Sequence, residues 1–289
     1  MIRLFQIGVF SCLLFWAGGC GAPEKEKPIW ERVKLRDIAS SNPDNQPVGR
    51  SLKTINFNVY IFEMPAERVG VLDDVWKMLY MEPVRFSDFD AFRANLFLVG
   101  FGHSRALNGV VDLVHSAGGR KAQTVSVLLP DEQYQDIGVA SLYGEKTVFY
   151  TPVGGSTEGV VVGPGRLALR VEAERIPGFR GLCSVKVRPA FAPTMRSPVQ
   201  QAGGRARSGE FLFDSASFQL KMTAGDFFFL GPKEYVDGQM TLASYFFSRP
   251  APSRGMTLLI PPSAEGEAAR PYFGPVVRTY MVLCTGIND

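Results

Sequence analysis

Residues 96–119 read "LFLVGFGHSRALNGVVDLVHSAGG", and this stretch decides the fold of the middle of the chain. The apolar run at 95–101 is typical of a strand, and the glycines at 100 and 102 indicate a turn after it. Four aliphatic residues then recur at the spacing of one helical face: Leu107, Val110, Val111 and Val114. Gly118 and Gly119 end that pattern. The stretch therefore predicts a strand, a glycine turn and an amphipathic helix over 105–116.

The segments on either side of this stretch predict an α+β fold. The alternating run "TINFNVYIFEM" at 54–64 is typical of a strand, and Pro65 suits the first turn of a helix. Beyond residue 123 the helical spacing disappears, and apolar runs split by Gly and Pro predict strands. We expect a small β-α-β-α module at 51–122, followed by a mostly antiparallel, sandwich-like β-domain at 123–289. Within that domain, 195–210 is predicted as a polar loop and 261–275 as a second loop.

The N-terminus carries an export pattern. Arg3 precedes the apolar run "LFQIGVFSCLLFW", and the small residues of "AGGC" follow at 17–20. A cysteine directly after such residues resembles the bacterial lipobox, which implies cleavage before Cys20 and lipidation of its thiol. Ala17 stands where the lipobox usually has Leu, and an ordinary signal peptide or an uncleaved anchor are the alternatives. We predict a signal peptide at 1–19 and a flexible tether at 20–50, which is charged and proline-containing.

The chain has four cysteines. Processing would remove Cys12 and lipidate Cys20, so Cys183 and Cys284 would remain in the folded body. One interpretation is a disulfide that closes the C-terminal half in an oxidising compartment. The other, which we favour, is two separate buried thiols that act as small hydrophobic residues. It predicts Cα atoms farther apart than the roughly 7 Å that a disulfide allows.

Ser104 lies in Gly102-His103-Ser104-Arg105-Ala106, close to the G-x-S-x-G turn that carries a hydrolase serine. Such a serine needs a histidine base and an orienting acid. The chain has two histidines, of which His103 is the neighbour of Ser104 and His115 lies near the end of the same helix. We therefore predict that Ser104 is the N-cap of helix 105–116 and not a nucleophile.

Three other motifs also have structural interpretations. Gly100, Gly102 and Ala106 form a loose dinucleotide-binding loop with Asp131 after the next strand, but the repeating β-α-β steps of a Rossmann unit are missing. Asp214 and Ser215 in "FLFDSASFQL" are similar to the aspartic-protease turn, which needs two copies. Asp88 and Asp90 in "SDFDAF" lack the other ligands of a calcium loop. The sequence predicts no catalytic residue, no cofactor and no metal.

Aromatic runs in two predicted strands offer the one candidate interface. Three consecutive Phe in a strand place rings on both faces, which suits either a central strand or a face that binds another subunit. The candidate interface residues are Phe227, Phe228, Phe229, Phe246 and Phe247. Nucleic acid is not an expected partner, because the net charge is only +3 and no long Lys/Arg run occurs.

The order of these elements resembles the periplasmic part of the secretins, a family of ring-forming outer-membrane channels. Asn95, Leu98, Val99 and Gly100 match the strand that precedes the helix in the small secretin module. "TAGDFFFLGP", "LASYFFSRP" and "RTYMVLCTGI" follow in the order of the later β-domain. The resemblance implies an assembly component. The long hairpins that line a channel are not evident, so pore formation is not implied.

We therefore expect an exported bacterial lipoprotein with a structural or protein-interaction role in the cell envelope, similar to a secretin assembly component. It would be anchored to a membrane by its lipid and face the periplasm or the exterior. We expect a protein partner or a second copy of the chain, and no enzymatic activity. The alternative is an envelope hydrolase with an unrecognised active site.

Overall fold

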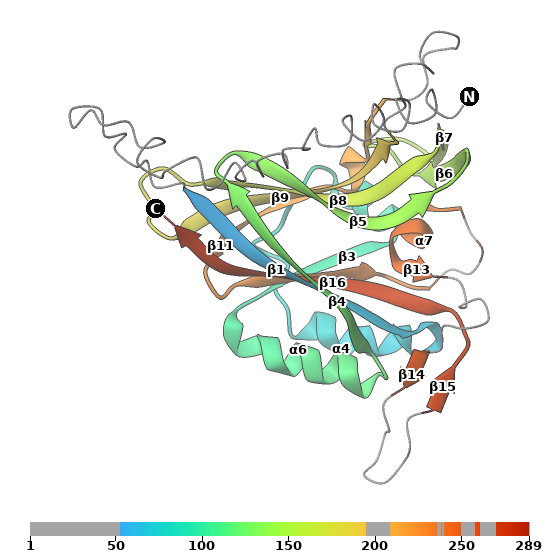
Figure 1. The fold of residues 1–289 in the computed structure, drawn as a ribbon, viewed down its shortest axis with the longest axis horizontal. Coiled ribbons are helices and arrows are strands. Elements are labelled where there is room, and N and C mark those ends of the chain that lie inside the picture. Colours follow the sequence, from blue (N-terminus) through green and yellow to red (C-terminus); the bar gives the residue numbers. More distant parts are fainter. Residues whose placement is uncertain are drawn as a thin grey trace, which may run out of the picture. The chain divides into compact units, whose positions relative to one another are not determined.

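A computed structural model describes residues 53–194, 209–235, 238, 240–249, 258–260 and 270–288 (Figure 1). Ser51–Asp289 forms one compact unit. The predicted signal peptide, the tether and Cys20 lie outside the described residues, as do most of the predicted loops at 195–210 and 261–275.

Two six-stranded sheets, in which all paired strands are antiparallel, form the frame of the described part. Sheet A has the order β3 (Phe97–Gly102), β12 (Phe227–Pro232), β16 (Val276–Asn288), β1 (Thr54–Pro65) and β4 (Arg120–Pro130), and β13 (Ser248–Arg249) also pairs with β16. Sheet B has the order β2 (Arg85–Phe86), β11 (Phe218–Thr223), β9 (Leu182–Pro193), β8 (Gly165–Arg175) and β5 (Gln133–Leu142), and β10 (Phe211–Leu212) pairs with β9.

Two hairpins and several short helices complete the described elements. The hairpins are β6 (Lys146–Tyr150) with β7 (Glu158–Val162), and β14 (Leu258–Ile260) with β15 (Arg270–Tyr272). The α-helices are α4 (Leu72–Lys77), α5 (Phe89–Ala94), α6 (Ser104–Ser116) and α7 (Leu242–Phe247), and the 3-10 turns are η3 (Ala66–Val71) and η5 (Asp214–Ala216). Among the described residues no helix is long and apolar enough to cross a membrane.

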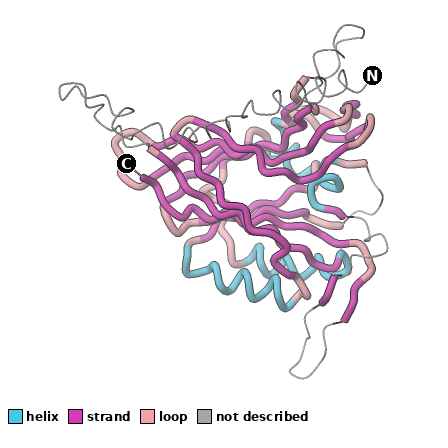
Figure 2. The backbone as a smooth tube through the Cα atoms, viewed as in Figure 1, coloured by secondary structure: helices cyan, strands magenta, loops and turns pink. Residues whose placement is uncertain are grey.

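The sheets stack face to face, and α4 and α6 cover the other face of sheet A (Figure 2). Strand β1 shows how the sequence builds these layers. Its alternating residues divide between two cores, because successive strand side chains point to opposite faces. Phe57, Val59 and Ile61 belong to the core between the sheets, and Phe62 and Met64 belong to the core under the helices. This three-layer arrangement confirms the predicted α+β class with a sandwich of antiparallel sheets.

The expected boundary at residue 122 is not a division of this fold. Strands β1 and β3 come from the predicted small module, yet they pair with β16 and β12 from the end of the chain. The whole segment Ser51–Asp289 therefore forms one compact unit. Pairing between strands more than 100 residues apart leaves no local signal in the sequence. The sequence alone therefore predicts residues 51–122 as a module separate from the β-domain.

Candidate functional site

The five aromatic residues of the candidate interface lie inside the folded unit, which corrects the prediction of an interface. None of their side chains is exposed by more than 1%. Phe228 packs edge-on against Phe218 of sheet B at 5.3 Å between ring centroids, and Phe229 packs against Trp76 of α4 at 5.3 Å. Strand β12 is central in sheet A, so the second sheet covers one of its faces and the helices cover the other.

The other two aromatic residues lie in a helix where the sequence predicted a strand. Thr241 caps α7, because its side chain accepts a hydrogen bond from Ser244 N at 3.2 Å. Phe247 packs edge-on against Phe97 of β3 at 4.7 Å. Phe246 packs against the same ring at 5.9 Å, and its carbonyl accepts a hydrogen bond from the Tyr280 hydroxyl. The α7 helix therefore closes one end of the sandwich.

The turn from β3 into α6 differs from the predicted serine cap. His103 is the N-cap residue, Ser104 is the first helical residue, and no side chain caps this helix. The imidazole of His103 instead lies 2.7 Å from the carboxylate of Asp226, joining Nδ1 to Oδ1. Gly102 permits this approach of the two strands, because a Cβ at that position would lie 2.5 Å from the ring of Phe227. The glycine therefore serves strand packing at the end of β3.

Asp226 organises the turn between β11 and β12. Its second carboxylate oxygen accepts hydrogen bonds from the backbone N of Thr223 at 2.8 Å and from the Thr223 hydroxyl at 2.7 Å. Gly225 has φ +93°, a left-handed conformation that glycine adopts without strain. The His103 ring also packs against Phe101 at 4.9 Å and lies 6.3 Å from Tyr80. This corner therefore presents a half-exposed imidazole held by a nearly buried carboxylate.

The corner does not bring a serine nucleophile and a base together. In the described part of the chain no hydrogen bond joins Ser104 to an imidazole or a carboxylate. His115 lies in the last turn of α6, where its ring is 6.4 Å from the ring of Phe62. The arrangement can hold the orientation of His103, but it does not assemble the contacts that a Ser-His-Asp triad needs.

The other acidic candidates bind neighbouring backbone or arginine groups. Asp88 caps α5 and also accepts a hydrogen bond from Gly154 N, and hydrogen bonds to Ala91 N and Gly154 N lower its pKa below the usual value. Asp131 accepts a hydrogen bond from Arg175 N at 2.7 Å. Asp214 lies in η5, 3.8 Å from Arg188. The part of the chain that the structure describes holds no group of three or more metal-binding side chains.

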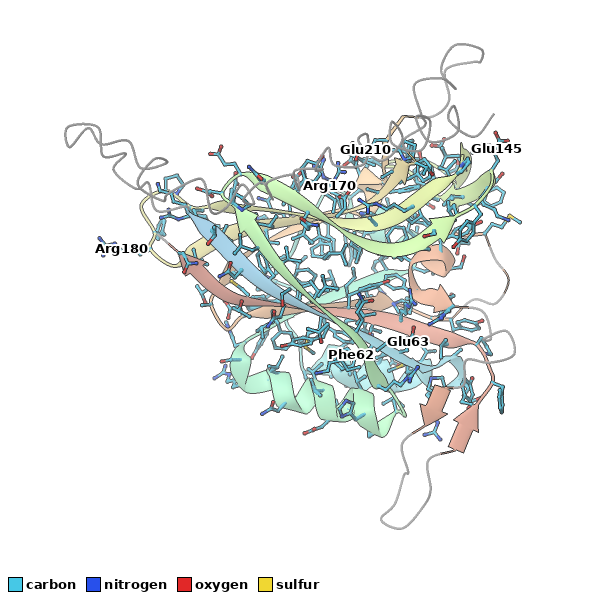
Figure 3. All side chains as sticks on the ribbon, in the orientation of Figure 1. Phe62, Glu63, Glu145, Arg170, Arg180 and Glu210 are labelled. Carbon is cyan, nitrogen blue, oxygen red and sulfur yellow. The ribbon has the colours of Figure 1, made fainter. Side chains whose placement is uncertain are left out.

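Sequence reasoning missed two charged clusters, which Figure 3 labels by Glu63 and Arg170. Glu63 lies almost fully buried between three arginines from neighbouring strands, at 3.0 Å from Arg249, 3.0 Å from Arg278 and 3.7 Å from Arg120. Burial acts to raise the pKa of Glu63, but the hydrogen bonds from Arg278 and Arg249 outweigh it and lower the pKa. The Glu63 cluster therefore keeps its carboxylate ionised and its arginines in place.

The second cluster lies on sheet B, where Arg170 is nearly buried among its partners. Its guanidinium makes two hydrogen bonds to Asp136, at 2.8 and 3.0 Å, and a third to Glu210. It also stacks 3.9 Å above the ring of Tyr134. Arg188 of β9 likewise pairs with Glu172 of β8. No sequence motif predicts these ion pairs, because the two partners of each pair come from different strands or from a strand and a loop.

The outer edge of sheet A is open at β4. Within the described residues β4 pairs with β1 alone, and its other edge faces no strand. The side chain of Leu128 in this strand is 63% exposed. Strand β4 leads through a short turn at Asp131 and Glu132 into β5, the edge strand of sheet B (Figure 1). An extended edge with an exposed aliphatic side chain is a surface on which another strand can add.

The two thiols left in the folded unit are neighbours, although the sequence favoured two separate cysteines. Cys183 and Cys284 are free thiols with buried side chains. The two side chains lie close enough across the sheets to shift each other's pKa, upward for Cys183 and downward for Cys284, which was not expected. Cys183 Sγ also donates to the carbonyl of Met222 at 3.5 Å.

Comparisons with known proteins give a weak structural likeness. No family model matches the chain, and no curated protein matches it. The secretin domain β-barrel of InvG from the Salmonella SPI-1 injectisome is 13% identical, with a TM-score of 0.23, and the match covers 82% of this chain and 64% of that chain. A second InvG secretin structure is 12% identical with a TM-score of 0.22, covering 82% of this chain and 65% of that one. The chain thus spans less than two thirds of the chains it matches, and at these TM-scores it is not assigned to the secretin family.

Proposed function

We propose that this chain is an exported, membrane-tethered lipoprotein of the bacterial cell envelope whose folded unit binds another protein. The partner is a second copy of the chain or another envelope protein, and it adds a strand to the open edge of β4. The observation that supports this role most directly is that β4, which is 11 residues long, pairs on one side only in the described part of the chain.

The composition of β4 supports the proposal. Natural edge strands are protected by charged residues, by proline or by shortness, because an exposed edge pairs readily with other chains. The charges of β4 lie at Arg120 and Lys121, and the following run "AQTVSVLLP" has none before it ends at Pro130. Val127 and Leu129 belong to the core, while Leu128 points away from it. The edge is therefore held in a fixed register and stays unprotected over most of its length.

The predicted N-terminal segment supports the proposed location at a membrane of the cell envelope. The export pattern and the cysteine at position 20 would place the folded unit on the outer side of a membrane, at the end of a charged, proline-containing segment. In this proposal the lipid supplies the membrane contact and β4 supplies the protein contact. The two features are independent, so each has its own experiment.

The strand-addition part is tested with a charge at the edge. Leu128→Lys should abolish the complex that is extracted from membranes in mild detergent and sized by native electrophoresis. The matched control is Val161→Lys, because Val161 is also an aliphatic strand residue and is 58% exposed, but lies in β7 away from this edge. An unchanged complex in Leu128→Lys, with both variants folded, would overturn the role of β4.

The lipid anchor is tested by Cys20→Ala and membrane fractionation. The variant should keep its signal peptide or be released from the membrane fraction. If it is processed and retained like the natural chain, the lipoprotein proposal is wrong.

A further inference from the structure

Cys183 and Cys284 belong to different sheets and meet in the core between them. Cys183 lies in β9 of sheet B, and Cys284 lies in β16 of sheet A. Neither side chain has exposed surface, and both belong to the same hydrophobic cluster. A covalent bond between them would therefore join the two halves of the sandwich from inside.

The backbone fixes both cysteines to the turn that joins the two sheets. In sheet B, Met222 of β11 is the register partner of Cys183. After Met222 the chain turns and enters β12 of sheet A. Within that turn Gly225 N donates to Cys284 O at 2.8 Å, and Cys284 N donates to Asp226 O at 2.9 Å. The same few residues thus hold Cys183 on one side and Cys284 on the other, which brings the two thiols close enough to shift each other's pKa.

We propose that Cys183 and Cys284 form an intramolecular disulfide that links sheet A to sheet B. The two S–H bonds break, one S–S bond forms, and two protons and two electrons leave the pair. A disulfide oxidant takes up the electrons by thiol–disulfide exchange and becomes a dithiol. The proposal shares with the proposed function only the oxidising compartment that export would supply, and it is independent of strand addition at β4.

The surroundings of the pair determine when this bond forms. Exchange requires the attacking sulfur and the oxidant to meet, so burial of both sulfurs slows it. The interaction between the two thiols and burial raise the pKa of Cys183, whereas the same interaction lowers the pKa of Cys284. It is therefore the lack of exposed surface on either side chain that keeps an oxidant away from the folded pair. In the folded protein the pair is therefore closed to oxidants, and the bond forms while the chain folds. Once formed, it is equally closed to reductants.

The experiment uses the full chain, reduced and unfolded in guanidinium chloride, and then refolded with oxidised glutathione. The refolded protein is unfolded again without reductant, labelled with a maleimide and mapped by peptide mass spectrometry. We expect the loss of label at both Cys183 and Cys284, and a linked peptide pair that disappears on reduction. Peptide mapping separates this pair from Cys12 and Cys20.

Two further measurements make the result decisive. The same oxidant added to the reduced, folded protein should close the bond more slowly than it does during refolding. The oxidised chain should unfold at a higher guanidinium midpoint than Cys183→Ala, because the closed loop restricts the unfolded chain. Full labelling of both cysteines after oxidative refolding, or linkage of either one to Cys12 or Cys20, would overturn the proposal. Because the oxidant is added to purified protein, neither outcome depends on where the chain lives or on what β4 binds.

Discussion

Replacing Glu63 by Gln tests whether one buried carboxylate holds the end of the sandwich together. The side chain of Glu63 is 3% exposed, and its Oε1 lies 3.0 Å from both Arg278 and Arg249. A hydrogen bond to a charged group contributes about 1.5–3 kcal/mol. Glutamine removes the charge from both bonds but keeps one oxygen acceptor, and water reaches the partly exposed arginines. We therefore expect the free energy of unfolding to fall by roughly 3 kcal/mol, at the lower end of the range for breaking a buried pair.

Urea unfolding followed by tryptophan fluorescence measures this loss. Trp76 packs 5.3 Å from Phe229 and reports on sheet A and its helices. The control is Asp74→Asn, which removes an exposed ion pair of 2.7 Å with Lys77. Exposed pairs contribute little, so the control should unfold at the natural urea midpoint.

The pH dependence distinguishes a charge effect from a packing effect. The folded-state pKa of Glu63 is lowered below its value of 4.5 in the unfolded chain. The stability that Glu63 contributes is therefore fully present above pH 4.5 and is lost as the pH falls through the folded pKa. The gap between the natural chain and Glu63→Gln should be largest near pH 7 and should close in acid. A gap that is absent at pH 7, or that stays constant into acid, would refute the ion-cluster explanation.

Four further substitutions test the core, a buried amide and the helix caps. Phe228→Ala should destabilise the folded unit by about 3–5 kcal/mol, because the ring is fully buried. The solution mass of the folded fraction should stay unchanged. A change of mass with normal stability would restore the interface interpretation. Asn95→Ala should cost roughly 3 kcal/mol, because its amide joins Ala91 O and Thr151 O, each at 2.8 Å; a thermal melt like that of the natural chain would contradict this. Ser104→Ala should leave the melting temperature unchanged, because Ser104 caps no helix. Thr241→Ala should lower the melting temperature, because it removes a helix cap that contributes about 1 kcal/mol to stability. Equal effects of the two substitutions would show that Ser104 is a cap after all.

Local features of the fold were predictable from the sequence. The alternation in 54–64 predicted β1, and the spacing of aliphatic residues predicted α6 within one residue of its observed start. Gly118 follows that helix with φ +74°, as a helix-ending glycine does. These features depend on neighbouring residues, so a reader of the sequence has all the information that determines them.

The chemistry of the candidate sites was much less predictable. His103 and Asp226 are 123 residues apart, and their contact depends on β3 and β12 becoming neighbours. Glu63 meets its arginines only because β4, β1 and β16 lie side by side and β13 pairs with β16. No spacing in the sequence encodes either cluster, since each partner is an ordinary charged residue until the strands pair.

The sequence by itself determined the α+β class and the strands with two apolar faces, and it predicts export from the pattern at its N-terminus. It could not decide what covers those faces. Burying an apolar side chain is favourable whether it packs against its own chain or against a partner protein. The alternation of apolar residues along a strand is the same in both cases. Only the tertiary structure decided that Phe227, Phe228 and Phe229 are covered by a second sheet and two helices of the same unit, and that Cys183 and Cys284 meet between the sheets. It also decided that β4 pairs on one side only among the described residues. These features follow from the order of the strands in the two sheets. That order depends on which of the many possible pairings between distant strands is most stable, and a single stretch of sequence does not determine it.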